Sequence, residues 1–184
     1  MAKNNIRSMA LCSLCTAIIA VCSQIMIPLT VPFTMQTFAV FCALGILGGK
    51  WGTVSVLLYI LLGAVGVPVF AEFTGGLGII LGTTGGYIVG FLLSALAYWG
   101  ITKLFGNGVF VMAAAMAAGL LLCYAFGTVW FMAVYARDNG AVGLATALSL
   151  CVFPFIIPDA VKISLAILIS RRVSKYAGIK GQPA

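Results

Sequence analysis

An all-α membrane protein, built as a bundle of six transmembrane helices, is predicted by three features of the sequence. Of its 184 residues, 63% are hydrophobic and only 7% are charged, whereas globular chains carry about 25% charged residues. The mean hydropathy is +1.21. Charges, prolines and glycine-rich stretches also divide the chain into apolar segments of helical length. We therefore expect lipid to surround most of the surface.

The apolar segments are the expected helices, in chain order. They lie near residues 9–27, 36–49, 52–67, 84–102, 109–134 and 143–170. About 20 residues span the hydrocarbon core, so the second segment is too short to cross upright and the third is marginal. We expect a short, tilted or partly re-entrant pair around Lys50. The first run lacks a small-x-small cleavage pattern, which predicts a retained helix.

Six spans leave room only for short loops, which predicts a single integral membrane domain over residues 1–184. No soluble ATPase module fits, so a step driven by ATP requires a partner protein. The basic residues predict the orientation of this domain. One side of the predicted bundle carries both termini and most of the cations, namely Lys3, Arg7, Lys50, Lys103, Arg171, Arg172, Lys175 and Lys180.

The opposite side carries only Arg137, and Lys162 falls within a predicted span. The positive-inside rule then places both termini in the cytoplasm of a multi-pass protein of the cell membrane. The net charge of +7 could suggest nucleic acid, but basic residues do not interleave with aromatic ones. We expect the lipid bilayer, and no nucleic acid, as a partner.

The two connections on the non-cytoplasmic side are unusually apolar. Residues 28–36 contain Pro28, Val31 and Phe33, and residues 67–76 contain Phe70 and Phe73. Exposing such side chains to water is costly. We expect both connections to fold back as a lid over a cavity.

Asp159 and Lys162 are ions at membrane depth. Proline followed by an acid is typical of a helix N-terminus, so a helix is expected to restart at Pro158. Asp159 lies twelve residues before Arg171, about 18 Å along a helix. At a spacing of three, the two ions share a helix face. They either neutralise each other or face a ligand pocket; intramembrane ions favour the second interpretation.

The remaining binding candidates are polar or small residues in or beside the outer connections: Gln36, Glu72, Thr84, Gly85, Gly86 and Tyr87. Gln36 can donate and accept hydrogen bonds, or simply cap a helix. An isolated acid such as Glu72 is usually only solvated. The backbone of residues 84–86 can pass close to a ligand, although glycines every fourth residue also predict close helix packing. Tyr87 offers a ring with a polar tip.

The first predicted helix carries small residues on two rows. Ser13 and Ala17 form one row, and Thr16 and Ala20 continue from Cys12 in a parallel one. Such rows dock other helices, either within the protein or from a partner subunit, and internal packing is the preferred interpretation.

Catalytic and metal chemistry find little support. The chain has no histidine, which excludes Ser-His-Asp and HExxH sites. Cys12 and Cys15 form a CxxC without a second pair, so we interpret the six cysteines as core residues. We predict no catalytic residues, no metal ligands and no cofactor, and therefore no enzyme.

Four ordered motifs resemble the BioY family, whose members are the biotin-specific S components of energy-coupling factor (ECF) transporters. They are Val31-Pro32-Phe33-Thr34-Met35-Gln36-Thr37, Gly66-Val67-Pro68-Val69-Phe70-Ala71, Gly82-Thr83-Thr84-Gly85-Gly86-Tyr87 and Pro158-Asp159-Ala160-Val161-Lys162. The resemblance implies a six-helix protein that captures biotin from outside. It would deliver biotin inward with a transmembrane coupling subunit and two cytoplasmic ATPases, through a toppling motion.

Carried onto this chain, the resemblance makes Asp159 and Lys162 the polar contacts to biotin, with Gln36, Tyr87 and the outer loops around the site. Our hypothesis is that Asp159 accepts a ureido N–H and Lys162 holds the carboxylate; a swapped arrangement through Glu72 or water stays open. Biotin would be a transported ligand that undergoes no reaction. A self-sufficient secondary transporter of a small carboxylate, coupled to ions through Asp159, is the alternative, ahead of an intramembrane enzyme or a purely structural subunit.

Overall fold

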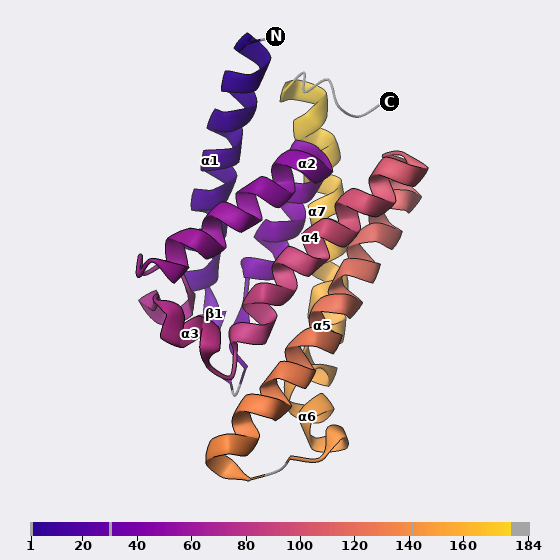
Figure 1. The fold of residues 1–184 in the computed structure, drawn as a ribbon. Helices are drawn as coiled ribbons and strands as arrows, with labels where there is room; N and C mark the ends of the chain where they lie inside the picture. The colour runs from indigo at the N-terminus through magenta and orange to yellow at the C-terminus, as the bar shows by residue number, and fades with distance from the viewer. Residues whose placement is uncertain (1, 30, 141, 178–184) are drawn as a thin grey trace.

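The computed structural model describes residues 2–29, 31–140 and 142–177. Within these ranges it is almost entirely helical, and the helices pack as one elongated bundle (Figure 1). The elements in chain order are α1 Ala2–Gln24, β1 Met26–Ile27, β2 Phe33–Thr34, α2 Gln36–Ala64, the 3₁₀ turn η1 Ala71–Phe73, α3 Leu77–Leu81, α4 Gly85–Phe105, α5 Val109–Asn139, α6 Leu144–Cys151 and α7 Phe153–Ala177.

Five helices of the described part of the chain, α1, α2, α4, α5 and α7, are long and apolar enough to cross a membrane. Large apolar side chains such as Leu121, Val129 and Ile157 are exposed along them, which is the arrangement that a lipid environment favours. The prediction of an all-α membrane protein is therefore confirmed. The predicted segments 84–102 and 109–134 correspond to α4 and α5.

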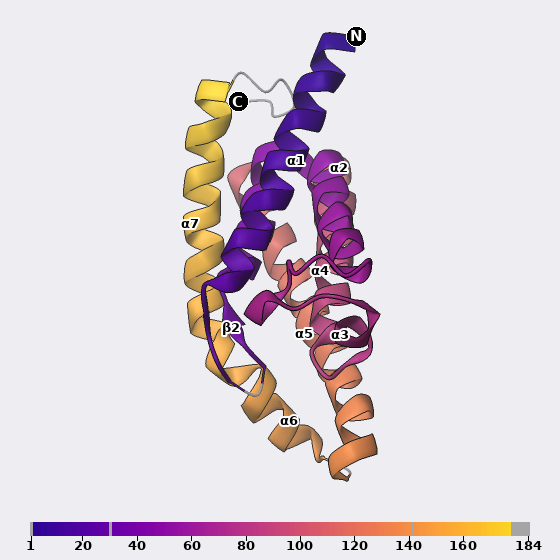
Figure 2. The same cartoon turned by 90° about the vertical axis from the view of Figure 1, so that its left-hand side faces the viewer.

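The predicted helix 9–27 ends earlier than expected. Helix α1 stops at Gln24, and Met26–Ile27 pairs as strand β1 with β2, antiparallel, in the first outer connection. Ile27 precedes Pro28, and the residue before a proline is disfavoured in helical conformation. Figure 2 shows the β1–β2 pair and α3 at the same level of the bundle, away from the start of α1.

Helix α2 covers the expected segment 36–49 and most of the segment 52–67, ending at Ala64, and it folds back on itself. Gly48 has φ 76° and ψ 171°, which interrupts the helix, and only glycine adopts such a φ at no steric cost. In a straight helix Gln36 and Tyr59 would lie about 34 Å apart. Instead, Gln36 Nε2 lies 3.0 Å from Tyr59 Oη, so the two halves of α2 form a hairpin that turns beside Lys50.

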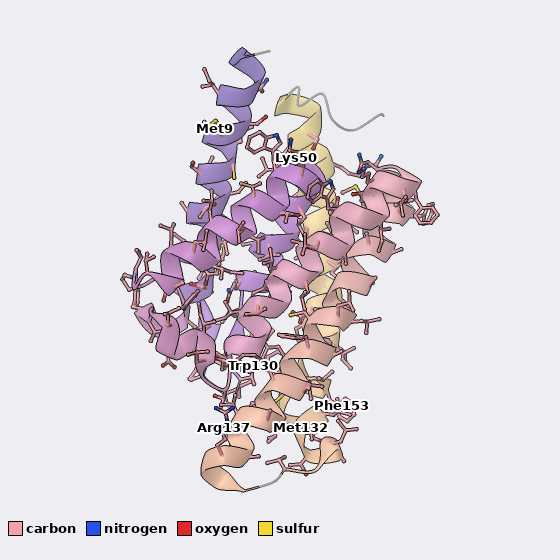
Figure 3. The ribbon with its side chains drawn as sticks, in the orientation of Figure 1. Met9, Lys50, Trp130, Met132, Arg137 and Phe153 are labelled. Carbon is pink, nitrogen blue, oxygen red and sulfur yellow. The ribbon has the colours of Figure 1, made fainter. Side chains whose placement is uncertain are left out.

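The cations separate along the bundle as the sequence predicts. The start of α1 and the end of α7 lie at the same end (Figure 1), and Lys50 lies at that end too, whereas Arg137 lies at the other (Figure 3). The two termini and Lys50 therefore share one end of the bundle, as the charge pattern predicts.

The expected helix restart at Pro158 is wrong. The predicted span 143–170 breaks at Val152, where φ is −127° and ψ is −56°, giving α6 and α7. Pro158 lies inside α7. Because Pro158 is the sixth residue of α7, its missing N–H removes only one intrahelical bond near the helix start. Asp159 and Lys162 consequently project from a continuous helix.

Close helix contacts hold the bundle together. A Cβ on Gly86 would meet Trp130, and one on Gly90 would meet Cys123, so α4 lies against α5 at both positions. Helix α1 packs on α2 through Thr16, whose hydroxyl lies 3.1 Å from both the carbonyl and the hydroxyl oxygen of Ser55. Small residues permit this approach.

Candidate functional site

A cavity of about 340 Å³ lies between the outer connections and helices α2, α4, α5 and α7. The first connection contributes Leu29, Val31, Pro32 and Thr34 to its wall, and the second contributes Phe70, Ala71, Glu72 and Thr74. Both connections therefore fold over a cavity, as their apolar composition predicts. Its volume falls in the range of small-molecule sites.

The Asp159–Lys162 pair forms the charged part of the wall. Lys162 Nζ lies 2.8 Å from Asp159 Oδ1 and donates to the carbonyl oxygen of Thr34 at 2.7 Å. It also lies 3.9 Å from the ring centroid of Phe33, a cation–π contact. Asp159 is 3% exposed and Lys162 4%. The two ions pair with each other, and both also line the cavity.

Tyr124, on α5, completes this ion pair. Its hydroxyl donates to Asp159 Oδ2 at 2.5 Å, so both carboxylate oxygens of Asp159 have a partner. Tyr124 lines the cavity as well. The sequence gives no signal for this role, because a tyrosine in an apolar helix carries no motif, and only the packing of α5 against α7 brings Tyr124 to Asp159.

Three further polar contacts involve residues at or beside the cavity wall. Gln36 donates to Tyr59 Oη at 3.0 Å, and the Tyr59 hydroxyl donates to the carbonyl oxygen of Val69 at 3.0 Å. The hydroxyl groups of Tyr87 and Thr128 lie 3.1 Å apart. These bonds fix the amide of Gln36 and the ring of Tyr87 within the wall.

Six of the eight predicted binding residues line the cavity: Gln36, Glu72, Thr84, Tyr87, Asp159 and Lys162. The exceptions are Gly85 and Gly86, which are not among the lining residues. A Cβ on Gly85 would meet the carbonyl of Ile80, and one on Gly86 would meet Trp130. Both glycines therefore lie in close contact with neighbouring residues. The spacing of glycines at every fourth residue indicated this packing for Gly86, whereas Gly85 lies outside that spacing.

The two small-residue rows of α1 differ in surroundings. Ser13 and Ala17 are exposed. Thr16 is buried against α2, and Ala20 is half-buried. The row of Thr16 thus packs internally, and the row of Ser13 and Ala17 is free of the bundle's own helices.

The remaining wall of the cavity is apolar and partly aromatic, with the rings of Phe91 and Phe155 beside Ile79, Ile88 and Leu120. A ligand suited to this cavity has a compact apolar body, hydrogen-bonding groups and a charge that can replace one partner of the ion pair. Helices and cavity together define a multi-pass membrane protein with space for one small molecule.

Comparisons with known proteins identify the family. The family model described as "BioY family" matches residues 1–178. The biotin transporter BioY of Thermotoga maritima is 40% identical over 161 residues, which cover 87% of this chain and 91% of that protein. The probable biotin transporter BioY of Pyrococcus horikoshii is 40% identical over 168 residues, 91% of this chain and 96% of that protein.

A solved structure agrees with this assignment. The crystal structure of the S-component for biotin from an ECF-type ABC transporter matches with a TM-score of 0.83 at 26% identity, over 95% of this chain and 94% of that one. The chain belongs to the BioY family. The resemblance drawn from the four motifs is confirmed.

Proposed function

We propose that this chain is the substrate-binding membrane subunit of an ECF-type vitamin uptake system, which captures biotin from outside the cell. The observation that carries the proposal is membership of a family whose relatives are named biotin transporters. A cavity of about 340 Å³ that contains a carboxylate–ammonium pair supports it. The role is that of a transporter subunit and not of an enzyme.

The chemistry of biotin fits the cavity wall. Its bicycle is rigid and mostly apolar, its ureido group has two N–H donors and one carbonyl, and its tail is anionic. We assign the ureido N–H to Asp159 and the carboxylate to Lys162, with Gln36, Thr84 and Tyr87 around the bicycle. Lys162 and Asp159 bond each other in the structure. When biotin binds, its carboxylate would pair with Lys162, while Asp159 would accept the ureido N–H and keep its bond from Tyr124. The swapped arrangement through Glu72 stays an alternative.

Delivery inward requires partners. We assign this role to a transmembrane coupling subunit and two cytoplasmic ATPases, and the exposed Ser13 and Ala17 of α1 are the row that suits docking of a partner helix. With the two halves of α2 counted separately, the chain crosses the cell membrane six times. The end with Lys50 then faces the cytoplasm, in keeping with the positive-inside rule.

Equilibrium binding of labelled biotin to the purified chain tests the proposal. We expect saturable binding of one biotin per chain, with thiamine and riboflavin unable to compete. Failure of biotin to bind, or equal competition by the other vitamins, contradicts it. In proteoliposomes with the coupling module, we expect uptake to require ATP; uptake that ignores ATP and collapses with an ionophore indicates an ion-coupled transporter instead.

Asp159→Asn tests the site within this proposal. It removes the charge that holds Lys162, and we expect the dissociation constant for biotin to rise at least tenfold while the protein still folds in detergent. Ser164→Ala is the matched control, since Ser164 is exposed on the same helix and bonds only the carbonyl oxygen of Ala160. Unchanged affinity in Asp159→Asn contradicts the site assignment.

A further inference from the structure

The end of α1 is fastened to the part of the second outer connection that comprises residues 69–74, here called the wall segment. Ser23 Oγ donates to the carbonyl oxygen of Val69 at 2.6 Å. Gln24 Nε2 donates to the carbonyl oxygen of Phe70 at 2.8 Å, and the backbone N–H of Phe73 donates to Gln24 Oε1 at 2.9 Å. One side-chain amide thus makes two bonds across the same turn.

The backbone of the wall segment needs such support. Glu72 has φ 60° and Phe73 has φ 53°, two consecutive non-glycine residues in the left-handed region, which side chains disfavour. Such conformations persist only where surrounding contacts hold them. The amide of Gln24 bonds the carbonyl oxygen of Phe70, two residues before the left-handed pair, and the N–H of Phe73, the second residue of that pair. Phe70 N–H donates to the carbonyl oxygen of Thr74 at 3.0 Å.

The wall segment covers the cavity. Phe70, Ala71, Glu72 and Thr74 all line it. The ring of Phe70 is buried and meets Tyr59 edge-on, with ring centroids 5.6 Å apart. Gln24 itself is not among the lining residues. Gln24 therefore supports the wall segment from outside the cavity and does not contact a bound ligand.

We infer that Gln24 is a positioning residue that latches the wall segment shut and thereby sets how fast biotin moves into and out of the cavity. The identity of the guest rests on the proposed function. The latch consists of the three hydrogen bonds that Ser23 and Gln24 make to the wall segment. All three join atoms of the chain, so the latch holds the segment whether or not a ligand is bound. Weakening it accelerates association and dissociation together and leaves the dissociation constant nearly unchanged. A residue that touches biotin changes that constant instead.

Gln24→Met is the test variant, because methionine keeps the length and helix propensity of glutamine but has no amide. Stopped-flow binding and isotope-chase dissociation on the purified chain give the two rate constants. We expect both to rise about tenfold, with the dissociation constant within about threefold of the wild type. Ile25→Ala is the control, since Ile25 is the next residue and is 57% exposed; we expect wild-type rates.

Phe73→Pro tests the latch from its other side. Proline removes the N–H that bonds Gln24 and fixes φ near −65°, far from the φ of 53° at Phe73. We expect the same acceleration as in Gln24→Met. In the double variant the two effects should not multiply, because both break the same contact.

Hydrogen exchange provides a readout that needs no ligand. The Phe73 amide should exchange at least about tenfold faster in Gln24→Met than in the wild type or Ile25→Ala. Unchanged exchange and unchanged rates overturn the latch, as does a rise in the dissociation constant without faster association. A wild-type protein that binds no biotin contradicts the proposed function, whereas the exchange experiment still decides on the latch.

Discussion

Buried polar groups near the cavity and buried polar groups farther along α4 and α7 differ in how they are hydrogen-bonded. Around the cavity these groups have partners, as in the Asp159–Lys162 pair and the Tyr87–Thr128 contact. Farther along α4 and α7, beyond the residues that line the cavity, the buried hydroxyl of Thr102 is bonded, but four buried hydroxyl groups of the described residues lack a hydrogen-bond partner. They are Ser94, Tyr98, Ser170 and Ser174.

This difference indicates where polar side chains hold the structure and where packing does. An unpaired buried hydroxyl costs about 1–3 kcal/mol, and Ser94 and Tyr98 on α4, like Ser170 and Ser174 on α7, contribute no hydrogen bond to the bundle. At the cavity, bonded networks hold side chains in one orientation, which is what recognition of a polar guest needs. Substitutions should therefore affect binding and stability together at the cavity, and stability alone farther along α4 and α7.

Lys162→Met should have the largest effect. It leaves the buried carboxylate of Asp159 with Tyr124 as its partner, and breaking a buried ion pair costs about 3–5 kcal/mol. We expect a loss of unfolding free energy of that order and a dissociation constant for biotin at least tenfold higher. Thermal unfolding in detergent and equilibrium binding measure the two effects.

Two controls sharpen this prediction. Lys103→Met, at the exposed end of α4, should change neither property measurably. Asp159→Asn combined with Lys162→Met should recover part of the stability but none of the binding, since no charge is left unpaired. Recovery of binding in the double variant contradicts the role of the pair in holding biotin.

Gly127→Ala and Gly119→Ala compare, on one helix, a glycine packed against a ring of the cavity wall with one packed against the unpaired Ser94. Both glycines lie on α5, and an added Cβ would meet the ring of Tyr87 at Gly127 and the backbone and hydroxyl of Ser94 at Gly119. Overpacking costs about 1–3 kcal/mol, so we expect both variants to lose stability. Only Gly127→Ala should also weaken biotin binding, by about three- to tenfold, because it displaces a ring of the cavity wall. Equal binding losses in both contradict the comparison.

Ser94→Ala should have the smallest effect, and it should raise stability where the other substitutions lower it. It removes a buried hydroxyl that has no partner in the described structure and replaces it with a better helix former. We expect the unfolding free energy to rise by about 1 kcal/mol, the lower end of the cost of an unpaired hydroxyl, with biotin affinity unchanged. A clear loss of stability would show that this hydroxyl bonds a group after all.

The fold was predictable where the apolar pattern is long. The segments 84–102 and 109–134 became α4 and α5 with small changes at their ends, because lipid demands helices with internally satisfied backbones. Boundaries set by local backbone geometry were less predictable. Val152, an ordinary apolar residue, breaks the last predicted span, while Pro158, the apparent break, lies inside α7.

The charged part of the site could be read from the chain itself. Asp159 and Lys162 are costly at membrane depth, and three residues of helix bring them to one face, so their pairing needed no tertiary information. Contacts between distant segments needed the fold. Tyr124 reaches Asp159, and Gln24 reaches Phe70 and Phe73, across separations of 35 to 49 residues. A tyrosine or glutamine in an apolar run has no pattern of its own, because its partner is chosen by how helices pack and not by its neighbours in sequence.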